Sequence, residues 1–316
     1  MESGQQSAGG RDKQKILLAV LVAAIVLSVG AIGYVMYSER NVSSITSSRA
    51  IVAGDTVILN YIGMLPDGRV FDTSLASVAN NNALYPKSLT FTLKSNDSYG
   101  PFTMIAGKYG DGGTIKGFAM GVIGLHVNET KLIEVPPGEG YSVDPTMIAT
   151  VKLVQDIPAT ETFTVSQFKS AFGTDPILMR TYTHFFWGWD VLVVDNTSGL
   201  VTLRYQPTVG EIVYPYGNPN SASNPLGWPV VVEAFDPSGF GGAGKVTIRH
   251  ELTVADVYNI KGVDVDGKQF VVTAFDATNG TFEIDKIDTQ TGYNGELAGR
   301  TLFFEVTIVK INPSQK

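Results

Sequence analysis

Residues 54–74 most restrict how this chain can fold, because they contain two short apolar runs separated by a tight turn. Alternation along the first run places Leu59 and Tyr61 on one face of a β-strand. Between the runs stands Pro-Asp-Gly, in which proline presets its own φ and glycine tolerates a positive φ. The second run ends in Phe71 and Asp72. This order predicts a β-hairpin that carries an aromatic ring and a carboxylate on its second strand.

Composition excludes several classes of function. The 316 residues include 23 basic and 30 acidic side chains, and the net charge of −7 argues against a nucleic-acid partner. The absence of cysteine rules out disulfides, thiolate catalysis and cysteine-based metal sites. The three histidines, His126, His184 and His250, are far apart in sequence. We therefore expect core or surface histidines and no metal site.

The N-terminal region predicts a membrane anchor. Residues 16–37 carry no charge, and a helix of this length rises about 1.5 Å per residue, enough to span a hydrocarbon core of ~30 Å. The tail 1–15 is basic next to this segment, whereas 38–50 is a Ser-rich spacer. A single-pass protein of the cell membrane is expected, with a cytoplasmic N-terminus and extracytoplasmic main domains. A cleaved signal peptide is the alternative, although the apolar run is long for one.

After residue 50 the pattern is dominated by short apolar runs between Gly, Pro, Asn and Asp clusters, which is typical of β structure. Residues 75–100 are predicted to form an extended loop that contains one strand over 89–93. Residues 117–125 are predicted to form one short helix.

Three similar units follow, at 190–204, 230–250 and 270–285. Each alternates, turns at Asp, Asn or Gly, and alternates again, so each is predicted to be a hairpin. Short helices are expected to begin at Thr164 and Thr253, where threonine is suited to cap a helix. The recurrence of helix and hairpin indicates a duplicated unit, but the self-similarity of any β-rich sequence explains it nearly as well.

Further motifs follow the first hairpin in a fixed order. They are Phe-Thr-Met-Ile-Ala-Gly at 102–107, Thr-Ile-Lys-Gly-Phe at 114–118, a strand into Pro-Pro and Tyr at 131–141, and a closing strand within 297–311. Taken with Tyr61 and Phe71-Asp72, this order resembles the whole pattern of FKBP-type peptidyl-prolyl isomerases.

The resemblance covers 51–157 and 297–312, so it implies an isomerase domain that is split. In the SlyD-like branch of the family, a second domain is inserted in the flap before the closing strand. Asn294 through Val306 are similar to the re-entry segment of that branch. Residues 160–293 would then form an enlarged insert-in-flap domain that binds substrate. The implied fold class is α+β, an FKBP-like antiparallel sheet curled around a short helix, with a mostly-β insert and one N-terminal transmembrane helix.

The chemistry expected of such a protein is non-covalent. Rotation about an Xaa–Pro bond is slow because amide resonance imposes a barrier of about 18–20 kcal/mol. A catalyst must bind the twisted amide better than either planar form. This calls for an apolar pocket for the proline ring and a few oriented hydrogen-bond donors. No cofactor is needed.

The resemblance implies which residues form that pocket. The expected walls are Tyr61, Phe71, Phe118 and Phe304, with Ile115 and Thr114 at the edge of the floor and Phe102 as a further substrate-binding residue. The Ile115 N–H and the Tyr141 hydroxyl would donate to substrate carbonyls, and Asp72 would orient Tyr61. Taken without the resemblance, the three phenylalanine walls are ordinary core residues and Asp72 closes an Asx turn. Phe118 stands where many family members carry Trp, and Gly-Tyr-Ser at 140–142 replaces the usual Ala-Tyr-Gly.

The implied function is a peptidyl-prolyl cis–trans isomerase and folding chaperone. Its expected partners are unfolded or proline-containing polypeptides among exported and membrane proteins. Two alternatives remain at this stage: a holdase chaperone with an inactive pocket, and a cell-surface β-rich module in which the FKBP fold is only a support.

Overall fold

Strands dominate the regular structure in the part of the chain that the computed structural model describes, residues 49–221 and 226–314. Eighteen strands lie there, against three α-helices of four, six and eight residues. The fold is therefore mostly β, and the expected α+β class is wrong. Alternating β-branched and aromatic residues continue through most of this region, which favours strands. The eight-residue helix ends at Gly173, whose left-handed backbone (φ 67°) is typical of a helix C-terminus.

No helix in the described ranges is both long enough and apolar enough to cross a membrane. The longest of them, α4 (Val165–Phe172), has eight residues. The predicted span over 16–37 lies outside the described residues, together with the tail 1–15. The structure thus gives no support to the transmembrane helix that was expected as part of the fold class.

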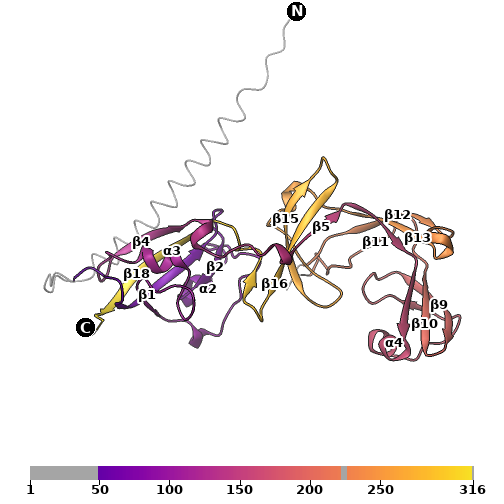
Figure 1. Ribbon diagram of the computed structural model, residues 1–316, viewed down its shortest axis with the longest axis horizontal. Helices are drawn as coiled ribbons and strands as arrows, with labels where there is room; N and C mark the ends of the chain where they lie inside the picture. Colours follow the sequence, from indigo (N-terminus) through magenta and orange to yellow (C-terminus); the bar gives the residue numbers. More distant parts are fainter. Residues whose placement is uncertain (1–48, 222–225, 315–316) are drawn as a thin grey trace, which may run out of the picture. The chain divides into compact units, whose positions relative to one another are not determined.

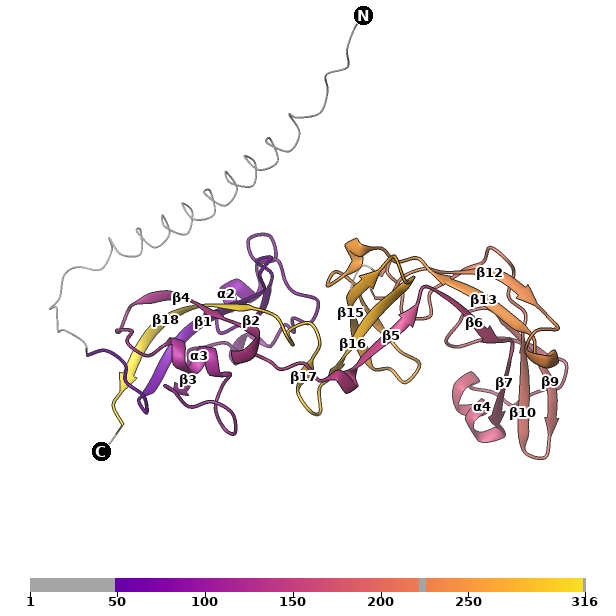
Figure 2. The same ribbon diagram turned by 45° about the horizontal axis from the view of Figure 1, so that its top comes forward.

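The first sheet includes a strand from the far end of the chain. Its order is β2-β1-β18-β4, and β3 pairs with the beginning of β1. The bounds are β1 (Thr56–Met64), β2 (Val70–Thr73), β3 (Phe102–Ile105), β4 (Thr130–Val135) and β18 (Leu302–Asn312). Figures 1 and 2 show the yellow ribbon of β18 between β1 and β4, although it is the last strand in the sequence.

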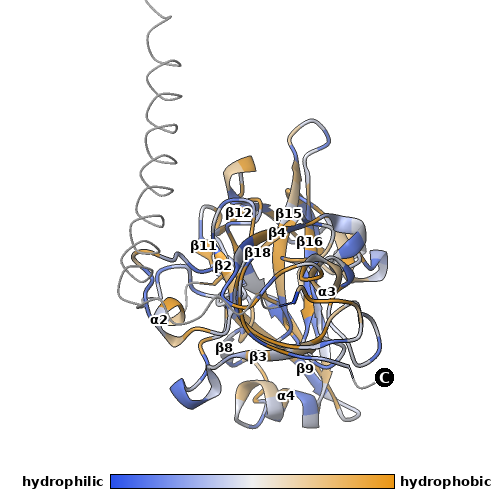
Figure 3. Ribbon diagram, turned by 90° about the vertical axis from the view of Figure 1, so that its left-hand side faces the viewer, coloured by the Kyte–Doolittle hydropathy of each residue, from blue (hydrophilic) through white to orange (hydrophobic). Residues whose placement is uncertain are grey.

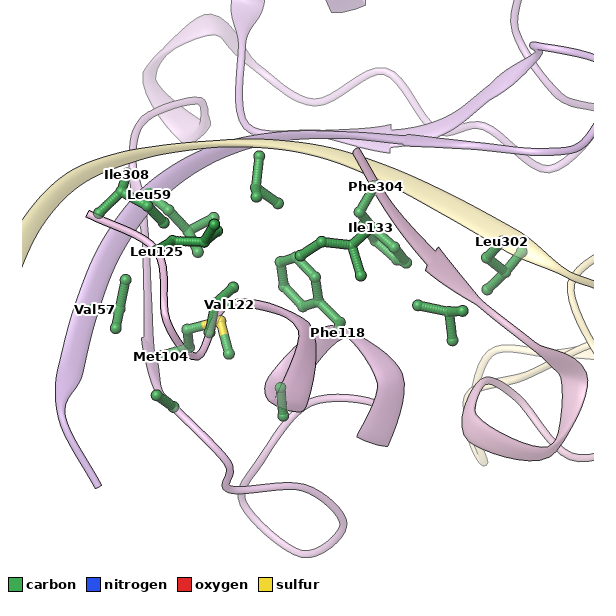
Figure 4. Close-up of a cluster of buried hydrophobic side chains, with 14 of the residues drawn as sticks. Val57, Leu59, Met104, Phe118, Val122, Leu125, Ile133, Leu302, Phe304 and Ile308 are labelled. Carbon is green, nitrogen blue, oxygen red and sulfur yellow. The ribbon is translucent and has the colours of Figure 1, made fainter. Parts of the chain in front are cut away.

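A short helix, α3 (Lys116–Gly121), packs on one face of this sheet. Figure 4 shows Phe118 of the helix directed toward Phe304 of β18. Gly117 allows the helix to approach β4 closely, because a Cβ at this position would lie 2.7 Å from Cγ1 of Val135. Around this contact the buried core includes Val57, Leu59, Met104, Val122, Leu125, Ile133, Leu302 and Ile308.

Three further sheets lie between β4 and β18, and they share one strand order. The orders are β8-β9-β10-β7, β11-β12-β13-β6 and β14-β15-β16-β5. In each sheet a central hairpin has on one side the short strand that precedes it in the sequence and on the other side one of the strands β5, β6 and β7. In the last sheet β17 also pairs with β16. The bounds are β5 (Ile148–Lys152), β6 (Val154–Pro158), β7 (Thr160–Thr164), β8 (Thr181–Thr183), β9 (Asp190–Thr197), β10 (Leu200–Tyr205), β11 (Ile212–Val213), β12 (Val230–Asp236), β13 (Lys245–His250), β14 (Lys261–Val263), β15 (Gln269–Asp276), β16 (Thr281–Asp288) and β17 (Tyr293–Asn294).

The three predicted hairpins are present, and they share an irregularity. The first strand of each carries one extra residue, Val194 in β9, Glu233 in β12 and Thr273 in β15. An extra residue of this kind bends a strand and increases its twist. The same strand order and the same bulge position in three sheets support a duplicated unit. From the sequence alone, the general self-similarity of β-rich sequences explained the recurrence nearly as well.

Local signals predicted some elements correctly and others not. The helix α4 begins with a capping box, in which Gln167 N–H donates to Oγ1 of Thr164 and Thr164 N–H donates to Oε1 of Gln167. Thr253 caps only a single 3-10 turn, and the helix predicted over 117–125 ends early, at Gly121. The short elements not yet named are α2 (Ala76–Ala79), η1 (Asn96–Ser98), η2 (Pro137–Glu139), η3 (Pro145–Met147), η4 (Phe240–Gly242) and η5 (Val254–Asp256).

The strand predicted over 89–93 is wrong, because this segment pairs with no strand of the described structure. Its backbone is held instead by side chains that are distant in sequence. The N–H groups of Leu89 and Thr90 both donate to the carboxylate of Glu296.

A second hydrophobic cluster belongs to the three inserted sheets. Its largest fully buried side chains are Phe168, Trp189, Trp228, Phe270 and Phe282. Figure 3 shows apolar and polar stretches alternating along the strands, with hydrophilic colours in several connecting turns. Burial on one face and exposure on the other is the pattern expected of antiparallel sheets that cover a core.

His250 lies in this second cluster with only 2% of its surface exposed. Its Nδ1 accepts the indole N–H of Trp228 over 3.0 Å, and its Nε2 lies 2.7 Å from the side-chain amide of Gln155. Burial lowers the pKa of His250 to about 4. Since an indole nitrogen can only donate, a proton added to Nδ1 would face another donor, and the folded protein keeps this ring neutral.

Because His250 is buried and neutral, we expect the free energy of unfolding to fall in mild acid. The folded pKa of about 4 lies below the ordinary value of 6.5, so the unfolded chain takes up the proton first as the pH falls. The stabilisation is fully present above pH 6.5 and is lost between pH 6.5 and 4, by at most about 3 kcal/mol. Denaturant unfolding at several pH values measures it. His250→Gln should flatten the slope, and an unchanged slope in this variant would contradict the assignment.

Candidate active site

One cavity of about 450 Å³ brings together all nine side chains that were singled out from the sequence. They come from four strands of the first sheet, from α3 and its N-terminal boundary, and from the loop after β4. The predicted residues on its wall are Tyr61, Phe71, Asp72, Phe102, Thr114, Ile115, Phe118, Tyr141 and Phe304. Their positions are therefore established by the structure, whereas their roles stay predictions.

A glycine on β1 leaves room for two of the aromatic rings. Gly63 is the register partner of both Phe304 on β18 and Asp72 on β2. A Cβ on Gly63 would lie 2.7 Å from Cζ of Phe71 and 3.2 Å from Cε1 of Phe304. The missing side chain therefore leaves the room that the rings of Phe71 and Phe304 occupy.

Aromatic rings form most of the cavity wall. Phe118 stacks on Phe304 with their centroids 4.5 Å apart, and Phe71 meets Phe304 edge to face at 5.5 Å. Tyr61 meets Phe118 edge to face at 5.9 Å. Phe102 lies 5.8 Å from Tyr61 and is 37% exposed, so it forms part of the rim. Such a wall excludes water and is suited to a small apolar ring.

The polar side of the cavity is organised around Asp72. The Tyr61 hydroxyl donates to Oδ2 of Asp72 over 2.6 Å. Burial and this hydrogen bond raise the pKa of Tyr61 far above its usual range, so its hydroxyl keeps the proton. The other oxygen of Asp72 accepts from the Thr73 N–H and from the ammonium group of Lys94, both over 2.9 Å. Asp72 thus fixes the orientation of Tyr61.

Two hydrogen-bond donors at the cavity are free within the described part of the chain. The Tyr141 hydroxyl has no protein acceptor there, and neither does the N–H of Ile115. Burial and the negative charge of Asp72 raise the pKa of Tyr141, which keeps its hydroxyl protonated. Ile115 is the N-cap of α3, and the Thr114 hydroxyl donates to its carbonyl oxygen over 3.2 Å. Both free donors are available to a bound carbonyl group.

Four lining residues were missed by reasoning from the sequence. They are Thr90, Thr92, Lys94 and Leu297. Thr90 and Thr92 belong to the segment that was predicted to be a strand. Nothing in the local sequence marks them as lining residues, since the carboxylate that holds Thr90 lies 206 positions later.

Comparison with known proteins shows which family the chain belongs to. A family model for FKBP-type peptidyl-prolyl cis-trans isomerases matches residues 47–164. A short-type peptidyl-prolyl cis-trans isomerase of Methanocaldococcus jannaschii is 34% identical over 123 residues, which cover 39% of this chain and 67% of that protein. The chain belongs to the FKBP-type peptidyl-prolyl cis-trans isomerase family.

Two fungal FKBP-type relatives match the same share of the chain. The FK506-binding protein 4 of Chaetomium thermophilum is 32% identical over 117 residues, and that of Aspergillus fumigatus is 32% identical over 114 residues. These matches cover 36% and 35% of this chain but only 19% and 18% of the fungal proteins. The likeness thus spans only a small part of those longer chains.

The range matched by the FKBP-type family model includes most of the predicted lining residues but not all of them. Eight of the nine predicted lining residues fall within 47–164. Phe304 lies outside this range, on the strand β18 that returns after the three inserted sheets. The cavity of this FKBP-type enzyme is therefore completed only by the last strand of the chain.

The free hydroxyl of Tyr141 predicts a selective loss of activity. Tyr141→Phe removes one donor from the cavity and breaks no hydrogen bond within the described structure. We expect kcat/KM on a short Xaa–Pro peptide to fall about two- to tenfold, the value of one net hydrogen bond. The free energy of unfolding should stay within about 0.5 kcal/mol of that of the unmodified chain.

A matched control is Tyr214→Phe, since Tyr214 is similarly exposed and lies outside the cavity. This control should leave kcat/KM unchanged. Equal activity of the Tyr141→Phe variant and the unmodified chain would show that the hydroxyl makes no contact with the reacting peptide.

Proposed function

We propose that this FKBP-type isomerase acts on unfolded, proline-containing polypeptides, with a cavity that catalyses and an insert that holds the client. The observation that carries the catalytic part is the cavity, in which an aromatic wall lies beside two donors that have no protein acceptor among the described residues. The insert is the segment 160–293, and the SlyD-like arrangement of the chain belongs to the same proposal.

The proposed mechanism stabilises a twisted amide without a covalent step. The proline ring enters the aromatic wall, where water is excluded and the ring loses no hydrogen bond. As conjugation is lost, the Ile115 N–H and the Tyr141 hydroxyl donate to carbonyl oxygens that flank the rotating bond. Donors that are already oriented stabilise the twisted form more than either planar form, which lowers the barrier. Asp72 serves by holding Tyr61 in place.

The insert offers apolar contacts to an unfolded chain. Three consecutive apolar residues, Ile177, Leu178 and Met179, are 48%, 56% and 69% exposed. Phe185, on the other side of β8, is 48% exposed. Contiguous apolar side chains at the surface are typical of sites that bind other polypeptides.

The insert also offers open strand edges. In the described structure β7 and β8 are the outer strands of their sheet, and β11 is the outer strand of the next. An extended polypeptide can add to such an edge through backbone hydrogen bonds, which require no fixed sequence. This suits a client that is recognised because it is unfolded.

Tethering explains why the two parts belong to one chain. A client held by the insert is presented to the cavity at a high effective concentration, so a weak catalytic site gains from a second contact. Exported proteins are the proposed clients. In the alternative proposal, a holdase, the insert would bind in the same way but the cavity would not accelerate isomerisation.

Two substrates of the purified chain test the proposal. The chain should accelerate isomerisation of a short Xaa–Pro peptide and also proline-limited refolding of an unfolded protein. L178S/M179S should lower the refolding rate by about tenfold or more, because the tethering contact is lost, and should leave the peptide rate unchanged. The control is Val265→Ser, which removes an exposed apolar side chain elsewhere in the insert.

Each possible result of this experiment has a different interpretation. No acceleration of either substrate would contradict catalysis and leave the holdase. Acceleration of both substrates with no effect of L178S/M179S would contradict client binding at this loop. A slower peptide reaction in that variant would show that the change acts on the cavity rather than on client capture.

A further inference from the structure

A fully buried carboxylate lies outside the cavity and holds part of its wall. Glu296, on the segment between β17 and β18, has 0% of its surface exposed. Its Oε1 accepts the Leu89 N–H over 2.9 Å, and its Oε2 accepts the Thr90 N–H over 2.8 Å and the Thr90 hydroxyl over 2.6 Å. A buried charge is costly unless hydrogen bonds satisfy it, and here three donors do so.

The Thr90 hydroxyl has both of its hydrogen-bonding roles filled. It donates to Glu296 and accepts from Nδ2 of Asn294 over 3.0 Å. Asn294 in turn accepts the Glu296 N–H on its Oδ1 over 2.9 Å. The hydroxyl, the carboxylate and the amide therefore form one closed network, which leaves a single orientation to the Thr90 side chain.

The carbonyl of Leu89 is held from the insert. Nζ of Lys261, at the start of β14, donates to the Leu89 carbonyl oxygen over 2.8 Å. The N–H of the same residue donates to Glu296, so both backbone polar groups of Leu89 are fixed by side chains. Nearby on the insert, the Tyr258 carbonyl accepts from Nη2 of Arg69 over 2.8 Å.

The segment held in this way runs directly into the cavity. Thr90, Thr92 and Lys94 line it, and Nζ of Lys94 lies 2.9 Å from Oδ1 of Asp72. Asp72 is the residue that orients Tyr61. Because no β-ladder of the described structure supports residues 89–94, the side-chain network contributes directly to the position of this wall.

We propose that Glu296 is a positioning residue of the isomerase, which holds the wall formed by Thr90, Thr92 and Lys94, with Lys261 as its support from the insert. Glu296 itself does not line the cavity, so it acts through Thr90 and not on the substrate. The proposal rests on the isomerase activity alone and does not depend on client binding by the insert.

The first experiment replaces the carboxylate by its isosteric amide in the full chain. Glu296→Gln turns an NH₂ group toward one of the N–H donors of Leu89 and Thr90, so one of these bonds is lost. The displaced wall contacts planar and twisted peptide alike, and we expect KM for a short Xaa–Pro peptide to rise about three- to tenfold with kcat within about twofold. Glu251→Gln, an exposed carboxylate on the insert, is the matched control and should change neither constant.

A purely structural role gives a different signature. A destabilised variant loses active enzyme, so kcat per total protein falls while KM stays the same. That result, with the fraction of folded protein reduced in circular dichroism, would overturn the proposal. An unchanged KM and kcat would overturn it as well.

A second pair of variants keeps the test valid if Glu296→Gln fails to fold. Thr90→Val preserves the shape of the side chain but removes the hydroxyl between Glu296 and Asn294, and we expect KM to rise about two- to fivefold. Thr90→Ser retains the hydroxyl and should restore KM to within about twofold of the unmodified value. Equal KM values for Thr90→Val and Thr90→Ser would overturn the proposal.

The support from the insert has its own variant. Lys261→Met leaves the Leu89 carbonyl without its donor and should raise KM for the same short peptide by about two- to threefold. A KM identical to that of the unmodified chain would remove Lys261 from the proposal. Because the peptide is too short to need the insert as a holding site, loss of client binding cannot produce this rise.

Discussion

The pairing of β18 between β1 and β4 is the constraint on which the candidate active-site cavity depends. Phe304 reaches the cavity from β18, so the aromatic wall is incomplete until the chain returns from the three inserted sheets. A long detour is tolerated because the entropy of loop closure grows slowly, by about 0.6 kcal/mol per doubling of length. The register between β1 and β18, in contrast, tolerates no slip. Phe304 stands opposite Gly63, and a slip of one residue would turn its ring to the other face of the sheet.

The cavity contains two kinds of hydrogen-bond donor, those already bonded to the protein and those that are free. Asp72 accepts from Tyr61 and Lys94, so the Tyr61 hydroxyl is committed to the protein. The Tyr141 hydroxyl and the Ile115 N–H are not committed within the described residues. An apolar wall with two oriented donors is suited to amide rotation, which requires stabilisation of a twisted bond and no bond cleavage.

Sequence patterns were informative where a structure is fixed by neighbours along the chain. Hairpins with Asp or Gly turns and the Thr164 cap were predicted because strand alternation and capping act over a few residues. The nine cavity residues were found because an ordered set of motifs survives an insertion. The segment 89–93 was mistaken for a strand because its apolar alternation is local, whereas its partner Glu296 is 207 positions away from Leu89. The α+β class was wrong because the family's single helix is outweighed by the strands of the insert.

The same long-range contact bears on how an inserted domain can serve an enzyme. If the insert were only a tether, its position would matter for the concentration of a client and not for the shape of the cavity. Lys261 and Glu296 instead hold the two polar groups of Leu89, next to a residue that lines the cavity. Energetic coupling between two sites is reciprocal, so under the proposed function a client that shifted β14 would alter the wall, and a peptide that ordered the wall would steady β14. Client capture by the insert and catalysis in the cavity would then be linked through the backbone of Leu89.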